Sequence, residues 1–457
     1  MRRHIRPAIL LAAMTAMTAL PLRGEEAAAF ESEPVLAAAT LVSPALLAGP
    51  GYRVEAQVPV VGFMARFTLL TDDGPLIADS IELLEERAIE MAALNALDTV
   101  GHGEAFLRAA ADSAGSRARA VTQVVRDPLG SIAGLPAGVL RYFQKELAKW
   151  GGRFRKHGDR IAHGARNDGD PEAVDGPMTG GRAHRPPRPD RPWYASAGRE
   201  VVRQAEDAVS HGSARRALAR HLGIDPYTAT RNPALNERLD RLAWSAAAGQ
   251  FGVDQLLGFL PAGTREAFGQ GERVNELVWS MDPEDLRARN REVLERWCGD
   301  GFQLRRFIRH RAFLASVQTR LVDALDALAP RSGCEHLLDL ALAADHDVEA
   351  RFMANALRLA GGYLGEVGRG AQIDTVGAGL TLATRDGRLV LPLPIDFLSW
   401  TETAAGFFEQ PALSTGPRLL LLTGTLSDRA LRELTRRGWE VVTRVPYAVA
   451  GTEPATG

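Results

Sequence analysis

The sequence predicts an α+β protein in which helices predominate, with an N-terminal strand and helix module, a helical domain and a small C-terminal βαβ layer. Three observations support this fold class. Strand-length runs of β-branched and aromatic residues occur before residue 80 and after residue 377. Between them, apolar residues recur at helical spacing. Gly and Pro divide that region into short and medium helices, and no period of roughly 20 to 50 residues repeats, so we exclude a solenoid.

The N-terminus has the pattern of a cleavable secretory signal peptide. Three arginines within the first six residues precede an uncharged stretch over residues 7–22, and Ala27 and Ala29 offer a cleavage site. The stretch is shorter than the roughly 20 residues that a membrane-spanning helix needs, and no Cys follows it to accept a lipid. We predict removal of residues 1–29 and export to the periplasm or the medium, with peripheral attachment to the envelope left open.

After the signal, residues 30–51 are Ala-, Leu- and Pro-rich and predict a flexible lead-in. The N-terminal module is expected over residues 52–150. It begins with strands over residues 52–70, and the turn sequence Thr71-Asp72-Asp73-Gly74 folds these back onto residues 75–78.

Helices complete this module. Asp79 and Glu82 have the spacing of a capping box, in which each side chain accepts a hydrogen bond from a free backbone N–H. The helix that they introduce is expected over residues 80–99. Further helices are predicted over residues 103–125 and 135–150.

A basic segment over residues 137–166 is the most distinctive feature of the mature chain. It carries eight Lys or Arg residues against Glu146 and Asp159. We interpret it as a membrane- or partner-binding element whose apolar side chains enter an anionic headgroup boundary while its cations meet phosphates. The residues assigned to binding are Arg141, Phe143, Lys145, Leu147, Lys149, Trp150 and Arg153. The alternative is a core helix with a solvated basic stripe.

Two later segments are expected to be disordered: a basic Pro- and Gly-rich linker over residues 151–196 and a tail over residues 451–457. A helical domain is predicted over residues 197–363. Asp282 before Pro283 has the residue order of a helix N-terminus.

A C-terminal α/β layer is expected over residues 364–450. Residues 380–393 predict a hairpin. A buried strand over residues 419–422, a helix capped by Ser427 and a strand over residues 439–445 predict a βαβ unit.

The loop between that strand and helix is the clearest candidate for ligand binding. Free N–H groups and the helix dipole at such a junction hold anions. The assigned residues are Thr423, Gly424, Thr425 and Ser427. The loop has a single Gly and no Lys, so it matches neither a Walker loop nor a dinucleotide-binding sequence. An ordinary βα turn is the competing interpretation.

No metal site or cofactor is predicted. Five metal-capable side chains lie close in sequence but lack the twice-repeated ligand pairs of a zinc site: Cys334, His336, Asp345, His346 and Asp347. No Gly-x-Ser-x-Gly sequence occurs, which removes the main signal of a serine hydrolase.

Isolated charged residues are interpreted as structural. We expect Glu86 and Glu90, together with Glu85, to be solvated charges on an exposed helix face. His102 is taken as a surface or capping residue at a helix junction.

Two cysteines are too few for a disulfide-built scaffold. Residues 302–329 contain neither Gly nor Pro, and a straight helix over them would be about 40 Å long at 1.5 Å per residue. A disulfide needs Cα atoms within about 7 Å, so Cys298 and Cys334 pair only if the chain doubles back. We therefore expect free thiols.

The sequence specifies no chemistry and assigns no catalytic residue. The formal net charge of −2 gives no support to nucleic-acid binding. The favoured hypothesis is an exported, non-enzymatic protein that binds an anionic membrane surface or an envelope protein through residues 137–166. The alternative is an exported hydrolase-type enzyme with a site assembled from distant residues near the loop over residues 423–427. A secreted factor that acts on other cells differs from the first hypothesis only in destination.

Overall fold

A computed structural model describes residues 30–101, 211–247 and 276–447 of the chain. In these residues the protein belongs to the α+β class, with 53% helix and 19% strand, so helices predominate as predicted. The signal peptide, the basic segment, the linker and the C-terminal tail predicted from the sequence lie outside the described residues.

No helix in the described part of the chain combines the length and the apolar character needed to cross a membrane.

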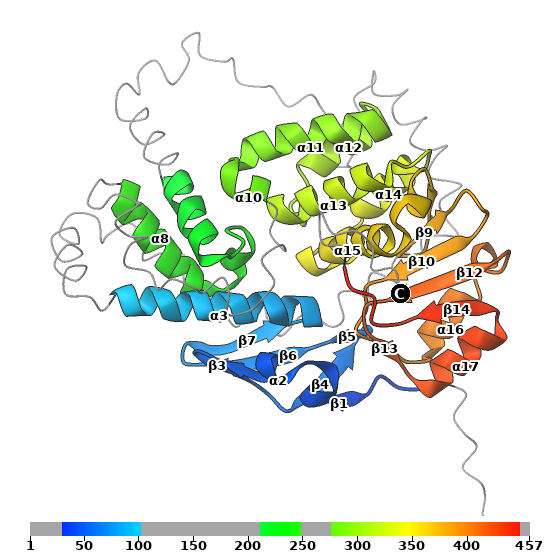
Figure 1. Ribbon diagram of the computed structural model, residues 1–457, viewed down its shortest axis with the longest axis horizontal. Helices are drawn as coiled ribbons and strands as arrows, with labels where there is room; N and C mark the ends of the chain where they lie inside the picture. Colours follow the sequence, from blue (N-terminus) through cyan, green and yellow to red (C-terminus); the bar gives the residue numbers. More distant parts are fainter. Residues whose placement is uncertain (1–29, 102–210, 248–275, 448–457) are drawn as a thin grey trace, which may run out of the picture.

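Two small antiparallel sheets form the base of the N-terminal half (Figure 1). The first has the order β1-β4-β5, and its strands are β1 (Val35–Ala37), β4 (Gln57–Val61) and β5 (Met64–Ala65). The second has the order β2-β3-β6-β7, and its strands are β2 (Ala48–Gly49), β3 (Tyr52–Val54), β6 (Phe67–Thr71) and β7 (Gly74–Ala78). The hairpin predicted around residues 71–74 is confirmed, with Thr71 opposite Gly74.

Residues 35–49 form regular elements where we expected a flexible lead-in. They contain β1, α1 (Ala38–Leu41), α2 (Pro44–Leu47) and β2. Strand β1 pairs with β4, with Leu36 opposite Val58, and this pairing ties the beginning of the described chain to the sheet.

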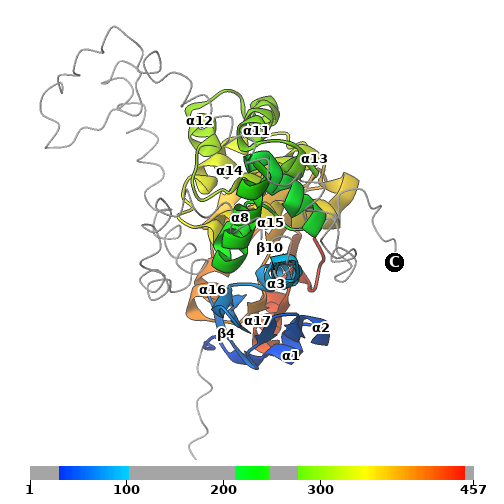
Figure 2. The same ribbon diagram turned by 90° about the vertical axis from the view of Figure 1, so that its left-hand side faces the viewer.

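Helix α3 (Ile81–Gly101) follows β7, close to the predicted position. Its cap is Ser80 and not the expected Asp79, because the Leu83 N–H donates to Ser80 Oγ at 2.9 Å. Asp79 instead accepts from Arg66 Nε at 2.5 Å. Figures 1 and 2 show α3 between the N-terminal sheets and α15, and Figure 2 views it nearly down its axis.

The first hydrophobic core joins α3 to the N-terminal sheets and to helices beyond residue 210. Its members include Phe67, Leu69, Leu84, Leu94, Leu218, Leu222 and Leu239. The last three belong to the helical residues 211–222 and to α8 (Pro233–Ala247). Residues 211–247 thus pack on the N-terminal module, whereas we expected one helical domain over residues 197–363. The predicted domain layout is therefore not confirmed.

The second core lies between a helical layer and a sheet. Its helices are α11 (Pro283–Cys298), α12 (Phe302–Ile308), α13 (Ala315–Leu328), α14 (Cys334–Ala341) and α15 (Asp347–Leu364), whereas α10 (Glu276–Ser280) contributes Trp279 to the first core. Helices α13 and α15 pack on each other, and α15 also contacts the sheet. The predicted cap Asp282 is confirmed, since its side chain accepts from the Glu284 and Asp285 N–H groups.

The sheet of this core has the order β14-β12-β10-β9-β8. Its strands are β8 (Gln372–Val376), β9 (Gly379–Ala383), β10 (Leu389–Leu393), β12 (Arg418–Leu422) and β14 (Trp439–Val442). The β9–β10 hairpin is antiparallel as predicted. Strands β12 and β14 are parallel and flank α17 (Asp428–Arg436), so the βαβ unit is confirmed.

Strand β10 is also parallel to β12, with Leu391 opposite Leu420, which the sequence did not indicate. Three parallel strands therefore end at one edge of the sheet. Two short strands, β11 (Phe397–Leu398) and β13 (Thr425–Leu426), pair beyond that edge. Helix α16 (Glu402–Phe408) follows β11. Short 3₁₀ turns complete this part of the chain at η3 (Gly365–Gly368) and η4 (Pro411–Leu413).

Cys298 and Cys334 form a disulfide, so the expectation of free thiols is wrong. The chain ends α12 at Ile308 and turns over residues 309–314 before α13 begins, although this stretch contains neither Gly nor Pro. The doubling back brings the two Cα atoms to 5.1 Å. The bond joins the last residue of α11 to the first residue of α14.

Candidate functional site

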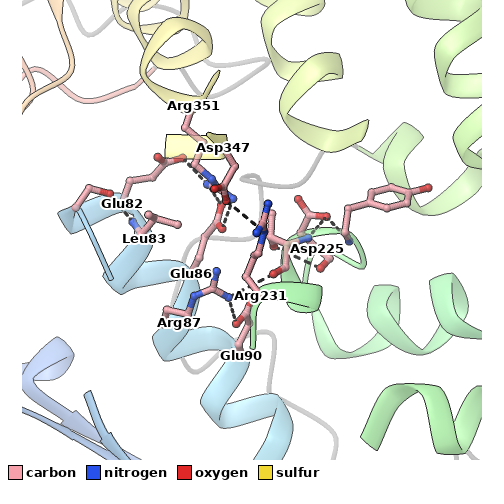
Figure 3. A network of polar contacts seen from close by, with 12 residues as sticks. Glu82, Leu83, Glu86, Arg87, Glu90, Asp225, Arg231, Asp347 and Arg351 are labelled. Atoms are coloured by element: carbon pink, nitrogen blue, oxygen red, sulfur yellow. Dashed lines mark hydrogen bonds and ion pairs between the residues drawn. The ribbon is translucent and has the colours of Figure 1, made fainter. Parts of the chain in front are cut away.

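Three acidic side chains of α3 lie in the interior between the two cores. Glu82, Glu86 and Glu90 are four residues apart and only 9%, 7% and 2% exposed. The expectation that Glu86 and Glu90 lie on a solvated face is wrong. Helix α3 has the N-terminal sheets on one side and α13 and α15 on the other, so both of its faces are covered. Figure 3 shows Glu82 and Glu86 pointing from α3 towards Arg351.

Arg351 of α15 binds Glu86 with both nitrogens of its guanidinium fork. Nη1 lies 2.9 Å from Glu86 Oε1, and Nη2 lies 2.9 Å from Oε2. Burial acts to raise the pKa of Glu86, but the charges of Arg351 and Arg320 outweigh it and hold this pKa well below its usual range. Glu86 therefore stays ionised in the interior.

Arg320 of α13 connects three segments of the chain. Its Nη1 and Nη2 each lie 3.2 Å from Glu86 Oε1, and Nη2 lies 3.3 Å from Asp225 Oδ2. Asp225 also accepts from the Thr228 N–H at the start of η2 (Thr228–Arg231). One buried guanidinium thus holds α3, α13 and the turn before α8 together.

Glu90 is less well compensated than Glu86. It forms an ion pair with Arg87, and Asn232 Nδ2 donates to its Oε2 at 3.3 Å. Its Oε1 has no hydrogen-bond partner among the described residues. Burial raises the pKa of Glu90 despite the opposing charge of Arg87.

Asp396 lies just beyond the carboxyl end of β10, where it joins the two halves of the protein. Its Oδ2 accepts from the Ala65 N–H at 2.9 Å and from the Ile81 N–H at 3.2 Å. Burial raises the pKa of Asp396 to about 7, although these two hydrogen bonds act to lower it, and the charges of Glu82 and Glu85 add to the increase. This carboxyl therefore titrates near neutral pH.

A small cavity lies beside Asp396. Its volume is about 20 Å³, and Glu82, Arg351, Asn355 and Tyr447 are among the side chains that line it. This space holds about one water molecule. Asn355 Nδ2 donates to Glu82 Oε2 at 2.6 Å, so part of the polar lining is already bonded within the protein.

Tyr447 adds a second group capable of proton transfer. Burial and the charges of Glu82 and Asp396 raise its pKa well above the ordinary value. The Arg358 guanidinium lies over its ring, 4.9 Å from the centroid. Sheets with parallel strands bind ligands at this edge, and a carboxyl that titrates near neutral pH suits acid–base chemistry. At about 20 Å³ the cavity has space for about one water molecule and is too small for a substrate.

The loop predicted to bind an anion uses its N–H groups within the protein. The Gly424, Thr425 and Ser427 N–H groups donate to the carbonyl oxygens of Ile395, Asp396 and Leu398 at 2.9, 3.0 and 3.0 Å. A side chain at residue 424 would lie 1.9 Å from the Asp396 carbonyl oxygen, so only Gly fits there. The anion-binding interpretation gains no support from this geometry.

The hydroxyl groups of the loop are also engaged. Thr423 Oγ1 donates to the Ile395 carbonyl at 3.0 Å. Ser427 Oγ accepts from the Ala430 N–H at 3.0 Å, which confirms the predicted cap of α17, and donates to Glu31 Oε2 at 2.5 Å. The loop is thus a structural junction that also anchors the first described residues.

The metal-capable side chains noted in the sequence have other partners. Cys334 is in the disulfide, and His336 forms an exposed pair with Asp374 at 3.1 Å. His346 is the N-cap of α15. Within the ranges that the structure describes, no three His, Cys, Asp or Glu side chains converge on a metal position.

The residues assigned to membrane or partner binding, from Arg141 to Arg153, lie outside the described residues, as does His102. Their role stays a prediction. Sequence reasoning missed Asp396, Arg320 and Arg351, because none of them belongs to a local motif.

No protein-family model, curated protein or solved structure matches this chain.

Proposed function

We propose that this protein is an exported, non-enzymatic binding protein of the cell envelope, in which the described residues form a closed scaffold and residues 137–166 contact the partner. The observation that carries the proposal is the closed state of the interior site. Glu86, Arg320 and Arg351 bind one another, and the cavity that Arg351 helps to line is about 20 Å³, which leaves no space for a substrate.

The energetics of buried charges support a scaffold role. Separating a buried ion pair leaves an uncompensated charge in a medium of low dielectric constant, at a cost of about 3–5 kcal/mol. Glu86 is held by two arginines from two other helices. Opening the interior to a substrate would break these contacts, so the arrangement favours rigidity over access.

Export is supported by two independent features. The N-terminal residues have the order of a signal peptide, and the Cys298–Cys334 disulfide is the kind of bond that persists in oxidising compartments. An anionic membrane surface is a partner available to such a protein.

The basic segment supplies the attraction to that surface. Each of its cations contributes about 1 kcal/mol of adsorption energy near an anionic leaflet. In the sequence, the segment falls between α3 and the helical residues 211–222, and both of these helices contribute to the first core. A partner bound to the segment is therefore linked to the rigid part of the protein.

Vesicle sedimentation of the purified mature protein tests this proposal. Phosphatidylcholine vesicles with added phosphatidylglycerol should retain the protein at low salt and release it at high salt. Lys145→Glu with Lys149→Glu should weaken retention. If anionic vesicles fail to retain the protein and the double variant behaves like the wild type, the membrane-binding proposal is rejected.

An exported hydrolase is the second candidate function, and the juxtaposition of Asp396 and Tyr447 favours it. Such a site requires movement at the start of α3 to admit a substrate. The test is hydrolysis of chromogenic ester, peptide and phosphoester substrates by the wild type, Asp396→Asn and Tyr447→Phe. We expect no activity. Turnover by the wild type that falls by about 10²-fold or more in Asp396→Asn would replace the binding proposal.

A further inference from the structure

Four arginines lie within seven residues at the end of α12 and in the turn after it. Arg305, Arg306, Arg309 and Arg311 are all exposed, and His310 lies half-buried among them. We call Arg305, Arg306, Arg309 and Arg311 the α12 basic surface.

Most of these guanidinium groups have no acidic partner among the described residues. Among the ion pairs of the described residues, only Arg305 takes part, with Asp300 Oδ1 at 3.1 Å from its Nη1. Arg306 lies over the Phe302 ring, 5.4 Å from the centroid. Arg309 and Arg311 form no ion pair within the described ranges. Folding alone does not account for this concentration of positive charge.

The electrostatic environment of His310 reflects the same concentration. Burial lowers its pKa first, and the charges of Arg306 and Arg311 lower it further. Asp345 is the acidic group that opposes them at this position. Among the described residues, Asp300 pairs with Arg305 of this surface. Two of the four arginines, Arg306 and Arg311, thus act with burial to favour the neutral form of His310.

The scaffold below the surface is rigid. Helix α12 packs against α11 and α14, and the Cys298–Cys334 disulfide joins these two helices. A planar guanidinium matches a phosphate with two parallel hydrogen bonds, and a rigid base reduces the entropy lost when several arginines bind together. The arrangement is suited to a surface that presents many phosphates.

We propose that the α12 basic surface is a second docking surface for anionic phospholipid, which acts together with residues 137–166. This inference rests on the proposed function. The chain as a whole carries a formal net charge of −2, so it is not a general polyanion binder, and its predicted export places it beside membranes. The half-buried ring of Phe302 next to Arg306 adds apolar area suited to a headgroup boundary.

Two weak contacts in one chain reinforce each other. A cation near an anionic leaflet strengthens adsorption by about fivefold, so three arginines give at most about a hundredfold. When residues 137–166 are bound, the effective concentration of the second surface at the membrane rises, and its contribution appears as avidity.

The experiment compares charge-reversal variants of the full mature chain on phosphatidylcholine vesicles with and without phosphatidylglycerol. R306E/R309E/R311E reverses three arginines of the surface. R241E/R369E/R432E makes the same change in net charge at exposed positions scattered over other elements. We expect the first variant to bind anionic vesicles at least tenfold more weakly than the wild type at low salt, and the control to bind within about twofold.

The outcomes separate this inference from the proposed function. If R306E/R309E/R311E binds like the wild type while Lys145→Glu with Lys149→Glu binds weakly, the second docking surface is rejected and the proposed function stands. If the wild type does not bind anionic vesicles, both are rejected. An equal loss in the scattered control also rejects the surface, because net charge alone then explains binding. Preference of the wild type for duplex DNA over anionic vesicles rejects the lipid assignment. Unchanged thermal unfolding of R306E/R309E/R311E ensures that a loss of binding reflects the surface itself.

Discussion

The buried arginines and the α12 basic surface use the same side chain in opposite ways. Arg87, Arg320 and Arg351 lie in the interior, and each binds at least one carboxylate. Arg309 and Arg311 lie on the surface and form no ion pair within the described residues. A buried guanidinium without a partner is strongly destabilising, so each buried arginine needs a carboxylate beside it in the folded protein. An exposed one needs no partner, and its function must be sought outside the fold.

The largest effect is expected from removal of a buried arginine. Arg351→Met removes the bidentate Arg351–Glu86 ion pair. Glu86 then keeps Arg320 as its remaining strong partner. The free energy of unfolding should fall by about 3–5 kcal/mol, measured by chemical denaturation. Arg369→Ala, at an exposed ion pair, is the matched control and should change it by less than about 1 kcal/mol. Equal effects would show that burial does not distinguish the two classes.

The disulfide should have the next largest effect. Cys298→Ser with Cys334→Ser removes a cross-link between residues 36 apart in sequence. The chain-entropy estimate for such a loop is about 3–4 kcal/mol of lost stability. Thiol titration of the denatured wild type should find no reactive thiol. Detection of two thiols in the exported protein would contradict the bond and the rigid base that it gives to α12.

Asp396 should make stability depend on pH. Its folded pKa of about 7 lies above the ordinary 3.8, so the folded state binds the proton more tightly. Its contribution to the free energy of unfolding is greatest at low pH, falls between about pH 4 and pH 7, and is constant above. At 1.36 kcal/mol per unit, the loss between pH 5 and pH 7 is at most about 2.7 kcal/mol.

The variant Asp396→Asn should remove this part of the pH dependence, measured as the difference from wild type by denaturation at pH 5 and pH 7. Asp73→Asn, in the exposed β6–β7 turn, is the control and should keep the wild-type slope. If the free energy of unfolding of Asp396→Asn still falls from pH 5 to pH 7, the pH dependence belongs to another group, such as Glu90.

Two serines before helices give a smaller, matched comparison. Ser80 accepts from the Leu83 N–H, whereas Ser43 precedes α2 without a side-chain cap bond. Ser80→Ala should lower the free energy of unfolding by about 1 kcal/mol, and Ser43→Ala should change it by a few tenths. Thermal unfolding checks both. A larger effect at Ser43 would contradict the assignment of the cap.

The smallest effect on stability is expected at the α12 basic surface. R306E/R309E/R311E should change the free energy of unfolding by about 0.5 kcal/mol or less in total, because these arginines hold no ion pair within the described part of the chain. A loss comparable with that of Arg351→Met would mean that the surface is structural.

Local signals in the sequence predicted much of the fold. The turn over residues 71–74, the β9–β10 hairpin and the caps Asp282 and Ser427 depend on neighbouring residues, so a single sequence reveals them. The parallel pairing of β10 with β12 did not appear, because nothing within either strand specifies its neighbour.

The candidate site could not be read from the sequence for the same reason. Glu86 is separated from Arg320 and Arg351 by 234 and 265 residues, so its helical position alone suggested a solvated face. Asp396 is a single carboxyl that belongs to no sequence motif. Its pKa is raised to about 7 by burial, which only the folded structure reveals. The disulfide was missed because the turn after α12 contains no Gly or Pro. The roles of Lys145, Lys149 and their neighbours stay predictions.

Sedimentation of the mature wild-type protein with phosphatidylglycerol-containing vesicles is the decisive test of membrane binding. At low salt most of the protein should sediment with these vesicles, little should sediment with phosphatidylcholine alone, and high salt should release it. Protein that stays in the supernatant with both kinds of vesicle at low salt would show that the scaffold does not present basic surfaces to an anionic membrane.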